Sequence, residues 1–419
     1  MLEALSRIQF AFTIGFHYLF VPASIGLILF VAIFETAHFA SRKTEYKALS
    51  NFYSEIFIVV YVVGIATGLT MPIQFGTNWS KYAVFMGDVF GSPLAFEALI
   101  AFFLESTFAG IWIFKRDKIG RGLRLIAVWL ILLGTSISAI WILTANSFMQ
   151  HPMGFALSAD KSKVILTNFG QVLGNPYLWW MFFHNHAAAF LIGAFIVLAV
   201  SARVMGRRGP LPMLKKSVAA ALAVACLASV SLPLVGLGYG RYLATAQPLK
   251  AALILGQVVS STEGGLKPAA TSGASLSIDL SSLPEFPNAV LVRACFLAMV
   301  ALGAVFIILA ILFAIRRGAF WKSPALRRAA AALVPLGYIA VACGWIVAEA
   351  GRFPWIVYGL MPVRDALSKV PVASVVFSLC LMVVLYALLA AVAITLIRRI
   401  VKKGPAAVFG PEEDSHAAA

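Results

Sequence analysis

Long apolar stretches alternate with short polar stretches over almost the whole chain. An α-helix needs roughly 20 mostly apolar residues to cross the hydrocarbon core of a bilayer. The nine stretches that reach this length lie at about 10–38, 52–75, 93–114, 125–147, 178–202, 217–238, 288–315, 329–350 and 371–397. The pattern therefore predicts an all-α integral membrane protein with nine transmembrane helices.

The composition excludes a water-soluble globule. Hydrophobic residues make up 61% of the 419 residues and charged residues only 12%, and the mean hydropathy is +0.92. Such values are typical of polytopic membrane proteins. The formal net charge is +16, but Lys and Arg neither form one block nor alternate with aromatic residues on a polar segment. The charge therefore does not indicate nucleic-acid binding.

The basic residues predict the topology instead. Most of the 33 Lys and Arg residues fall in the loops that follow the first, third, fifth and seventh apolar stretches, or after the ninth. Loops rich in Lys and Arg are generally cytoplasmic. An odd number of helices puts the termini on opposite sides, so we expect the N-terminus outside and the C-terminus in the cytoplasm.

Residues 1–403 are predicted to form one membrane domain. Within it, residues 239–287 are rich in Gly, Ser, Thr and Pro and are predicted to form an outside loop with little regular structure. Residues 404–419 are predicted to be a disordered cytoplasmic tail. The four cysteines lie in apolar stretches without a Cys-x-x-Cys-His motif, which favours core filling over a covalent haem.

Three residues place a metal-ligating side chain within a predicted transmembrane helix. They are His17, His184 and Glu349, and the topology puts all three in the outer half of the membrane. An ionisable side chain in lipid is costly, so it indicates a functional site, here an iron-porphyrin site. The alternative for a histidine is a hydrogen bond to a neighbouring helix. His186 is too close in sequence to His184 for both to bind one iron, so one of them has a structural role.

Two carboxylates share the third apolar stretch. Glu97 and Glu105 are eight positions apart, a little over two turns at 3.6 residues per turn, and so lie on one helix face. Such a pair is typical of a proton path that descends from a buried site. The alternative is a carboxylate that pairs with an arginine in the core.

Several motifs in unbroken order resemble subunit I of the cytochrome bd quinol oxidases, over nearly the whole chain. They are Ser6–Phe10, Phe16–Pro22, Thr67–Thr70, Gln74–Trp79, Pro93–Glu97, Phe102–Thr107, Trp141–Leu143, Ala145–Asn146, Met149–Gln150, Gly344–Glu349, Gly351–Arg352 and Pro354–Trp355.

The resemblance implies four-electron reduction of dioxygen to water with quinol as the donor. It also implies three haems and a partner membrane subunit II, with a small single-helix subunit in some members. His17 and Glu349 match the axial ligands of two high-spin haems, a haem b and a chlorin-type haem d that some members replace with haem b. His184 matches one ligand of the low-spin haem b that takes electrons from quinol.

The resemblance gives further residues a role. Glu97 and Glu105 match residues near the oxygen site and on its proton route, and Ser138 and Asn146 are candidate members of the same route. Residues that match those holding haem propionates and the electron path are Arg7, Trp345 and Arg352. Residues that match the quinol-binding loop are Gln247 and Lys250.

Three positions depart from the family pattern. The methionine that usually ligates the low-spin haem is replaced by Leu379, and Met382, three residues later on a similar helix face, is the candidate substitute. The glutamate five positions after the quinol-loop lysine is replaced by Leu255, which cannot accept a proton from quinol. The glutamine usual before the Pro-Trp motif is Phe353.

The sequence therefore predicts the catalytic subunit of a bd-type terminal oxidase in the bacterial inner membrane. Two of the departures fall on the electron-donor side, so a bd-like haem oxidase with a donor other than quinol is an alternative. Alternatives of a different class are a cofactor-free, proton-coupled transporter that uses the same carboxylates as a relay, and a haem-binding redox sensor without turnover.

Overall fold

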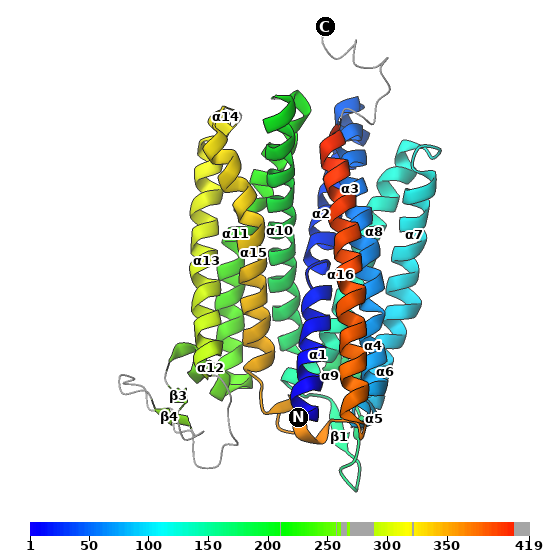
Figure 1. The fold of residues 1–419 in the computed structure, drawn as a ribbon, viewed down its shortest axis with the longest axis vertical. Coiled ribbons are helices and arrows are strands. Elements are labelled where there is room, and N and C mark those ends of the chain that lie inside the picture. The colour runs from blue at the N-terminus through cyan, green and yellow to red at the C-terminus, as the bar shows by residue number, and fades with distance from the viewer. Residues whose placement is uncertain (210, 257, 261–265, 269–288, 321, 406–419) are drawn as a thin grey trace.

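The computed structural model describes residues 1–209, 211–256, 258–260, 266–268, 289–320 and 322–405. Within these ranges, nine helical segments are long and apolar enough to cross a membrane, which confirms the predicted number. They stand side by side as a bundle (Figure 1). The first span begins at one end of the bundle, and the last span finishes at the opposite end.

Several spans consist of more than one helical element. The nine spans are α1 (Leu2–His17) with α2 (Val21–Ser41); α3 (Thr44–Gly68) with α4 (Thr70–Thr77); α6 (Gly87–Phe96), the π-helix η1 (Glu97–Phe102) and α7 (Phe103–Lys115); α8 (Arg121–Gln150); α9 (Phe169–Leu173) with α10 (Pro176–Arg208); α11 (Pro212–Ala246); α13 (Ala289–Ile315); α15 (Pro324–Ala350); and α16 (Val372–Lys403).

Short elements connect the spans. The helical ones are α5 (Ser80–Phe85), α12 (Pro248–Leu255), α14 (Arg317–Phe320) and the 3₁₀ turn η3 (Val363–Asp365). Three antiparallel pairs of short strands complete the described residues: β1 (Phe155–Leu157) with β2 (Val164–Leu166), β3 (Val258–Ser260) with β4 (Leu266–Pro268), and β5 (Trp355–Val357) with β6 (Met361–Pro362).

Helices α2 and α10 form the centre of the bundle. Gly26 and Gly193 face each other so closely that a Cβ on Gly26 would lie 2.6 Å from the Cα of Gly193. Small residues allow this direct backbone contact between membrane helices. Helices α11, α13 and α15 lie on one side of α10, whereas α3, α7, α8 and α16 lie on the side of α2 (Figure 1).

Two spans depart from the continuous helix that hydropathy predicts. The first is interrupted between His17 and Val21, where α1 ends and α2 begins with Pro22 in its first turn, a position that tolerates the missing N–H of proline. The third contains Pro93 inside α6 and then the π-helical turn that starts at Glu97. π-helical turns occur frequently at functional sites.

The prediction for residues 239–287 is wrong in its first part. Residues 239–246 continue α11, and Pro248 starts the further helix α12, which ends at Gly256 in the left-handed conformation with φ 74°. Proline suits the first position of a helix and glycine suits its end. The rest of this segment contains β3 and β4, and residues 257, 261–265 and 269–288 lie outside the described residues. So does the tail from residue 406.

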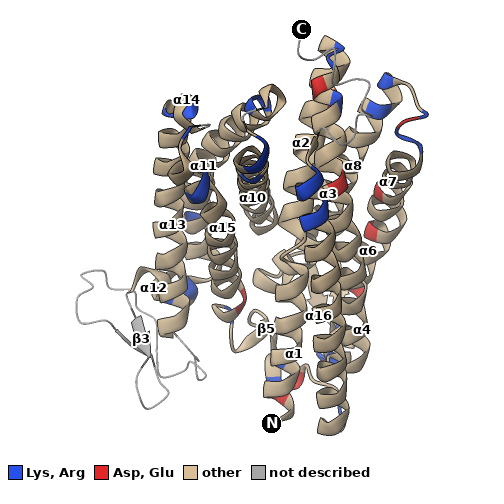
Figure 2. Cartoon of the chain, turned by 45° about the horizontal axis from the view of Figure 1, so that its top comes forward, with Lys and Arg blue, Asp and Glu red and all other residues tan. Residues whose placement is uncertain are grey.

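Lys and Arg gather at the end of the bundle that carries α14 and the last turns of α16 (Figure 2). At the same end, Arg124 of α8 forms an ion pair with Glu35 of α2, and both side chains are buried. Asn51 of α3 accepts a further hydrogen bond from Arg124 at 3.0 Å. This contact ties three helices together near the predicted cytoplasmic surface.

Candidate functional site

Glu349 lies in the last turn of α15, at the end of the bundle opposite the basic residues. Its Oε2 accepts a hydrogen bond from Arg352 Nη2 at 2.7 Å, and its Oε1 accepts one from Asn146 Nδ2 at 3.0 Å. The side chain keeps 26% of its surface exposed. Residues from α8 and from the turn after α15 therefore hold one carboxylate in a fixed orientation, and three of the predicted site residues meet there.

Gln150, the last residue of α8, joins the same cluster and was not among the predicted site residues. Its Nε2 lies 3.3 Å from Glu349 Oε1 and 3.2 Å from the carbonyl oxygen of Ala348. Its Oε1 accepts hydrogen bonds from Lys250 Nζ at 2.9 Å and Gln247 Nε2 at 3.0 Å. The two predicted loop residues, Lys250 in α12 and Gln247 just before it, are thus connected to Glu349 through one glutamine.

Lys250 is buried although it carries an amine. Its Nζ also donates to the carbonyl oxygen of Ala348 at 2.9 Å. Burial holds the pKa of this amine well below its usual range, and the nearby Arg352 lowers the pKa further, whereas Glu349 opposes the shift. The lysine therefore sits beside the carboxylate cluster as a hydrogen-bond donor that is easily deprotonated.

His17 is the last residue of α1, next to the interruption of the first span. Its Nδ1 forms a 3.0 Å hydrogen bond with Thr67 Oγ1. Gly68 leaves room for the ring, since a Cβ there would lie 3.1 Å from the Cε1 of His17. A bond that fixes one ring nitrogen orients the other, which is how proteins prepare histidine to ligate a metal.

Tyr18 connects the surroundings of His17 with two other helices. Its ring stacks on Trp345 of α15 with centroids 5.2 Å apart and planes at 24°. Its hydroxyl donates to Asn185 Oδ1 of α10 at 2.7 Å. Because Asn185 follows His184, one tyrosine bridges the regions of two predicted haem ligands and stacks on a predicted electron-path residue.

His184 and His186 have different environments on α10. This helix starts with Pro176 after the N-cap Asn175, whose Oδ1 accepts from the backbone N–H of Tyr177 at 3.0 Å. The Nδ1 of His184 is buried and has no hydrogen-bond partner in the described part of the chain. His186 instead contacts the carbonyl oxygen of Phe182 at 3.0 Å and Ser136 Oγ at 3.3 Å. These contacts favour a structural role for His186 and His184 as the candidate ligand.

Glu97 and Glu105 both face α8. Glu97 Oε1 accepts a hydrogen bond from Ser138 at 2.9 Å, and Glu105 Oε1 accepts one from Thr135 at 2.8 Å. At Gly134 the two helices approach so closely that a Cβ would lie 3.1 Å from the Glu105 backbone. Neither carboxylate pairs with Lys or Arg among the described residues. The described contacts therefore do not support the alternative of a core carboxylate paired with an arginine. The two carboxylates and two hydroxyls form a row along one helix interface.

The remaining predicted residues lie apart from these contacts. Arg7 is 42% exposed, lies 3.6 Å from Glu3, and places its guanidinium 4.3 Å from the centre of the Phe353 ring. Met382 is half-buried on α16, and no described contact joins it to His184. The structure therefore joins Glu349, Arg352 and Asn146 directly, connects Gln247 and Lys250 to them through Gln150, and places Glu97, Ser138 and Glu105 along one helix interface. Among the described contacts, Tyr18 relates Trp345 to the regions of His17 and His184, and none joins Arg7 or Met382 to another predicted residue.

Several buried polar atoms of the predicted site residues and their neighbours have no hydrogen-bond partner in the described part of the chain. Besides His184 Nδ1, they include Asn146 Oδ1, Trp141 Nε1 and Arg352 Nη1 in the described residues. Leaving such an atom unsatisfied costs about 1–3 kcal/mol. A haem offers iron to an imidazole and propionate carboxylates to a guanidinium, so the residues present fit this group.

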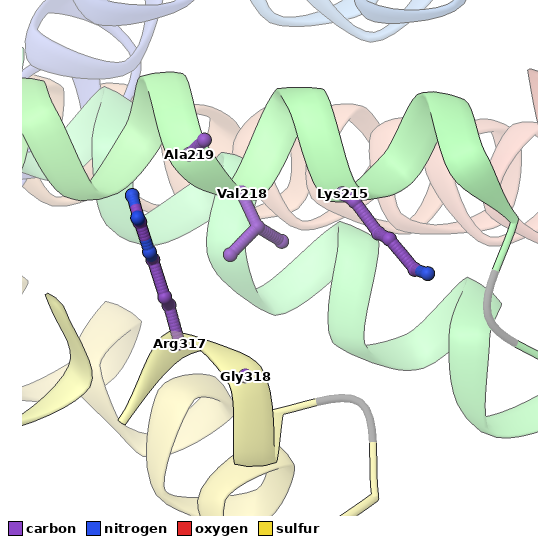
Figure 3. A pocket seen from close by; sticks show the side chains of 5 residues that line it. All are labelled: Lys215, Val218, Ala219, Arg317 and Gly318. Carbon is purple, nitrogen blue, oxygen red and sulfur yellow. The ribbon is translucent and has the colours of Figure 1, made fainter. Parts of the chain in front are cut away.

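A cavity of about 320 Å³ lies at the other end of the bundle, between the first turns of α11 and α14 (Figure 3). Its lining residues are Lys215, Val218, Ala219, Arg317 and Gly318. It shares no residue with the clusters around Glu349 and Glu105.

Comparison with known proteins agrees with the geometry. The family model described as cytochrome bd terminal oxidase subunit I matches residues 5–273 and 265–405. Cytochrome bd ubiquinol oxidase subunit 1 of Bacillus subtilis is 35% identical over 98% of this chain and 95% of its own length. Cytochrome bd-II ubiquinol oxidase subunit 1 of Escherichia coli is 39% identical over 60% of this chain and 49% of its own length.

A solved structure shows the same fold. The bd oxidase from Geobacillus thermodenitrificans matches with a TM-score of 0.85 at 24% identity, over 96% of this chain and 98% of that chain. The nine apolar helices and these relatives indicate a multi-pass protein of the bacterial inner membrane.

Proposed function

Because this chain belongs to the cytochrome bd terminal oxidase subunit I family, we propose that it oxidises quinol and reduces dioxygen to water. The observation that carries this proposal is the cluster around Glu349, where Arg352, Asn146 and Gln150 orient a partly exposed carboxylate. Family membership also separates the chain from a cofactor-free transporter.

His17, Glu349 and His184 would hold the haems. When bound, haem supplies the reversible one-electron chemistry and the open iron position that dioxygen requires. Imidazole is a strong-field ligand that suits a low-spin, electron-transferring haem, and we assign this role to His184. A carboxylate is a weaker ligand that leaves iron high-spin, which suits Glu349. The second ligand of the low-spin haem is assigned to Met382.

The residues around Glu349 hold its carboxylate in one orientation. Arg352 compensates its negative charge at 2.7 Å, and Asn146 donates to the other oxygen. Partners of this kind orient a ligand and tune its basicity. Trp345, on the same helix as Glu349, is the candidate electron path, because it stacks on Tyr18, which follows His17 and donates to Asn185 beside His184.

Glu105 and Glu97 would move protons along α8. Each carboxylate is hydrogen-bonded to a hydroxyl of that helix, so protons pass between groups that can both donate and accept. Protons taken from the cytoplasm to a site in the outer half of the membrane carry charge through it. The energy conserved is about 2.3 kcal/mol per charge per 100 mV.

Lys250 and Gln247 would contact the quinol headgroup. A donor other than quinol is favoured by one observation: Leu255, at the end of α12, exposes 63% of its surface where the family has a carboxylate. As partners we propose a subunit II-like membrane protein and a small single-helix subunit. Exposed apolar residues on α13 and α16, such as Ile308 and Leu388, are available for membrane or subunit contacts.

Oxygen uptake by the purified complex tests this function. The donors to compare are a short-chain quinol and a chemically reduced, water-soluble electron donor. Uptake with quinol that is lost in Lys250→Ala supports quinol oxidation. Uptake only with the water-soluble donor, unaffected by Lys250→Ala, supports the alternative donor, and no uptake with either contradicts the oxidase assignment.

A further inference from the structure

Gln150 is fully buried, and each polar group of its side chain has a partner. The amide nitrogen donates to Glu349 and Ala348, and the amide oxygen accepts from Lys250 and Gln247. An amide offers two donor hydrogens and two acceptor lone pairs. The described contacts use all four.

No other side chain of similar size can make these contacts. A glutamate would accept from Lys250 but would place a second carboxylate against Glu349, and a leucine would remove one hydrogen-bond partner from each of Lys250 and Glu349. Glutamine therefore connects a basic group on α12 to an acidic group on α15 without adding charge to the site.

Further contacts fix the position of α12 relative to the ends of α8 and α15. Gln247 Nε2 donates to the backbone oxygen of Gln150 as well as to its side chain, which anchors the start of α12 to the end of α8. Gly351 packs against Lys250, since a Cβ there would lie 2.9 Å from Lys250 Cε. A shift of α12 would therefore act on the end of α15 through Gln150 and through the contacts of Lys250 with Ala348 and Gly351.

We propose that Gln150 is a positioning residue that couples the position of α12 to the orientation of the Glu349 carboxylate. The inference rests on the proposed function, in which α12 carries the donor-binding residues and Glu349 holds a high-spin haem. The free energy of binding at α12 is then coupled to the electronic state of that haem, so a change in either one changes the other.

The test compares Gln150→Leu, Lys250→Met and the double variant in the purified complex. The readouts are the high-spin haem bands of the reduced-minus-oxidised spectrum and deuterium exchange over residues 247–256. Lys250 also donates to the Ala348 carbonyl oxygen, next to Glu349, so the double variant, and not Lys250→Met alone, shows whether a band shift is transmitted through Gln150. We expect both single variants to shift the same bands, and the double variant to shift them no further than Gln150→Leu does.

Gln150→Glu separates the contact of Gln150 with Lys250 from its contact with Glu349. It keeps an acceptor for Lys250 but loses the donor to Glu349, so the haem bands should shift while exchange over α12 stays slow. Gln74→Leu is the matched control, because Gln74 is also a buried glutamine but contacts Thr13 instead. It should leave the bands in place.

Unchanged haem bands in Lys250→Met together with shifted bands in Gln150→Leu would overturn the coupling and leave Gln150 as a local support of Glu349. Shifts that add in the double variant would overturn it as well. Wild-type complex without haem bands would instead contradict the proposed function.

The cavity between α11 and α14 supports a second inference from separate observations. Two cationic side chains, Lys215 and Arg317, line it together with apolar Val218 and Ala219, and no acidic residue among those that the structure describes lines it (Figure 3). It lies at the end of the bundle where Lys and Arg gather (Figure 2). Basic pockets between helices at the cytoplasmic surface suit anionic lipid headgroups.

The neighbouring surface suits the acyl chains of such a lipid. Ile308, Ile311 and Ile315 are exposed at three- and four-residue intervals, so they line one face of α13 that ends beside α14. We propose that the cavity binds the phosphate of an anionic phospholipid, with its acyl chains along this face.

Thermal unfolding of the detergent-solubilised complex tests the site, with phosphatidylglycerol, phosphatidylcholine or inorganic phosphate added. We expect phosphatidylglycerol alone to raise the midpoint. The Lys215→Gln/Arg317→Gln double variant should lose this rise, whereas Arg207→Gln, at the same end but outside the cavity lining, should keep it. Equal responses in both variants would mean general charge attraction, and a rise with phosphate alone would mean an anion site; either result overturns the lipid site.

Discussion

Asn146 Nδ2 lies 3.0 Å from Glu349 Oε1, and these residues are on different helices, α8 and α15. The other amide atom of Asn146, Oδ1, is buried and without a partner among the described residues. One side chain thus orients the carboxylate and also presents a polar atom for a further group. This is the relationship expected between a metal ligand and the residue that positions it.

Asn146→Leu should weaken haem binding or oxygen uptake by about 10- to 100-fold, which is typical for loss of a group that orients a metal ligand. The measurement is haem content and oxygen uptake per purified complex. Ser147→Ala is the control, because this neighbouring hydroxyl donates to the Thr144 carbonyl oxygen and has no other hydrogen bond among the described residues. Equal activity of Asn146→Leu and wild type would show that Glu349 does not depend on Asn146.

Glu105→Gln should reduce oxygen uptake by about 100-fold or more, because an amide cannot carry the proton that a carboxylate can. The haem spectrum should stay as in the wild type, since Glu105 contacts Thr135 and not the Glu349 cluster. Glu55→Gln is the control, as Glu55 pairs with Arg116 and lies outside the row along α8. Full oxygen uptake in Glu105→Gln would remove this residue from the proton route.

Arg124→Met should destabilise the fold by about 3–5 kcal/mol, because it leaves the buried Glu35 carboxylate without its partner. The Glu35→Leu/Arg124→Met double variant should recover much of this loss, since no unpaired charge then remains. Thermal unfolding in detergent measures both. Arg364→Ala, in an exposed pair with Asp365, should leave the midpoint unchanged. A single variant as stable as wild type would contradict the structural role of the pair.

We expect acidification to weaken the contact between His151 and Tyr242, in which His151 Nδ1 lies 2.8 Å from the tyrosine hydroxyl. Burial lowers the pKa of His151 below its ordinary value of 6.5, so the folded protein holds the neutral ring. The unfolded chain therefore binds the proton first as pH falls. The stability from this group is complete above pH 6.5 and is lost as pH falls through the lowered pKa.

His151→Gln should flatten this part of the pH dependence, because glutamine does not titrate. Thermal midpoints of wild type and variant between pH 7 and pH 5 measure the difference. Parallel curves for the two proteins would show that other groups control the acid response.

Hydropathy predicted the nine spans because the length of each apolar stretch is set by the bilayer and not by neighbouring helices. It could not predict the interruption after His17 or the π-helical turn at Glu97, since these change backbone geometry without changing composition. The helix α12 was missed because the segment around it is rich in residues typical of loops.

The candidate ligands were predictable because an ionisable residue in an apolar stretch stands out. Gln150 was not, because it is uncharged and its partners Lys250 and Glu349 are 100 and 199 positions away in sequence. Its contacts depend on how the ends of α8 and α15 meet the start of α12. The same holds for Tyr18, whose contacts with Trp345 and Asn185 exist only in the folded bundle.

The most direct test of a haem oxidase held by these residues is a reduced-minus-oxidised optical spectrum of the purified complex. Wild type should be compared with Glu349→Ala and His17→Ala, using dithionite and then quinol as reductants. We predict low-spin and high-spin haem bands in wild type with both reductants, and loss of a high-spin band in each variant. Wild-type protein that is folded but free of haem bands, or variants with unchanged bands, would contradict the account.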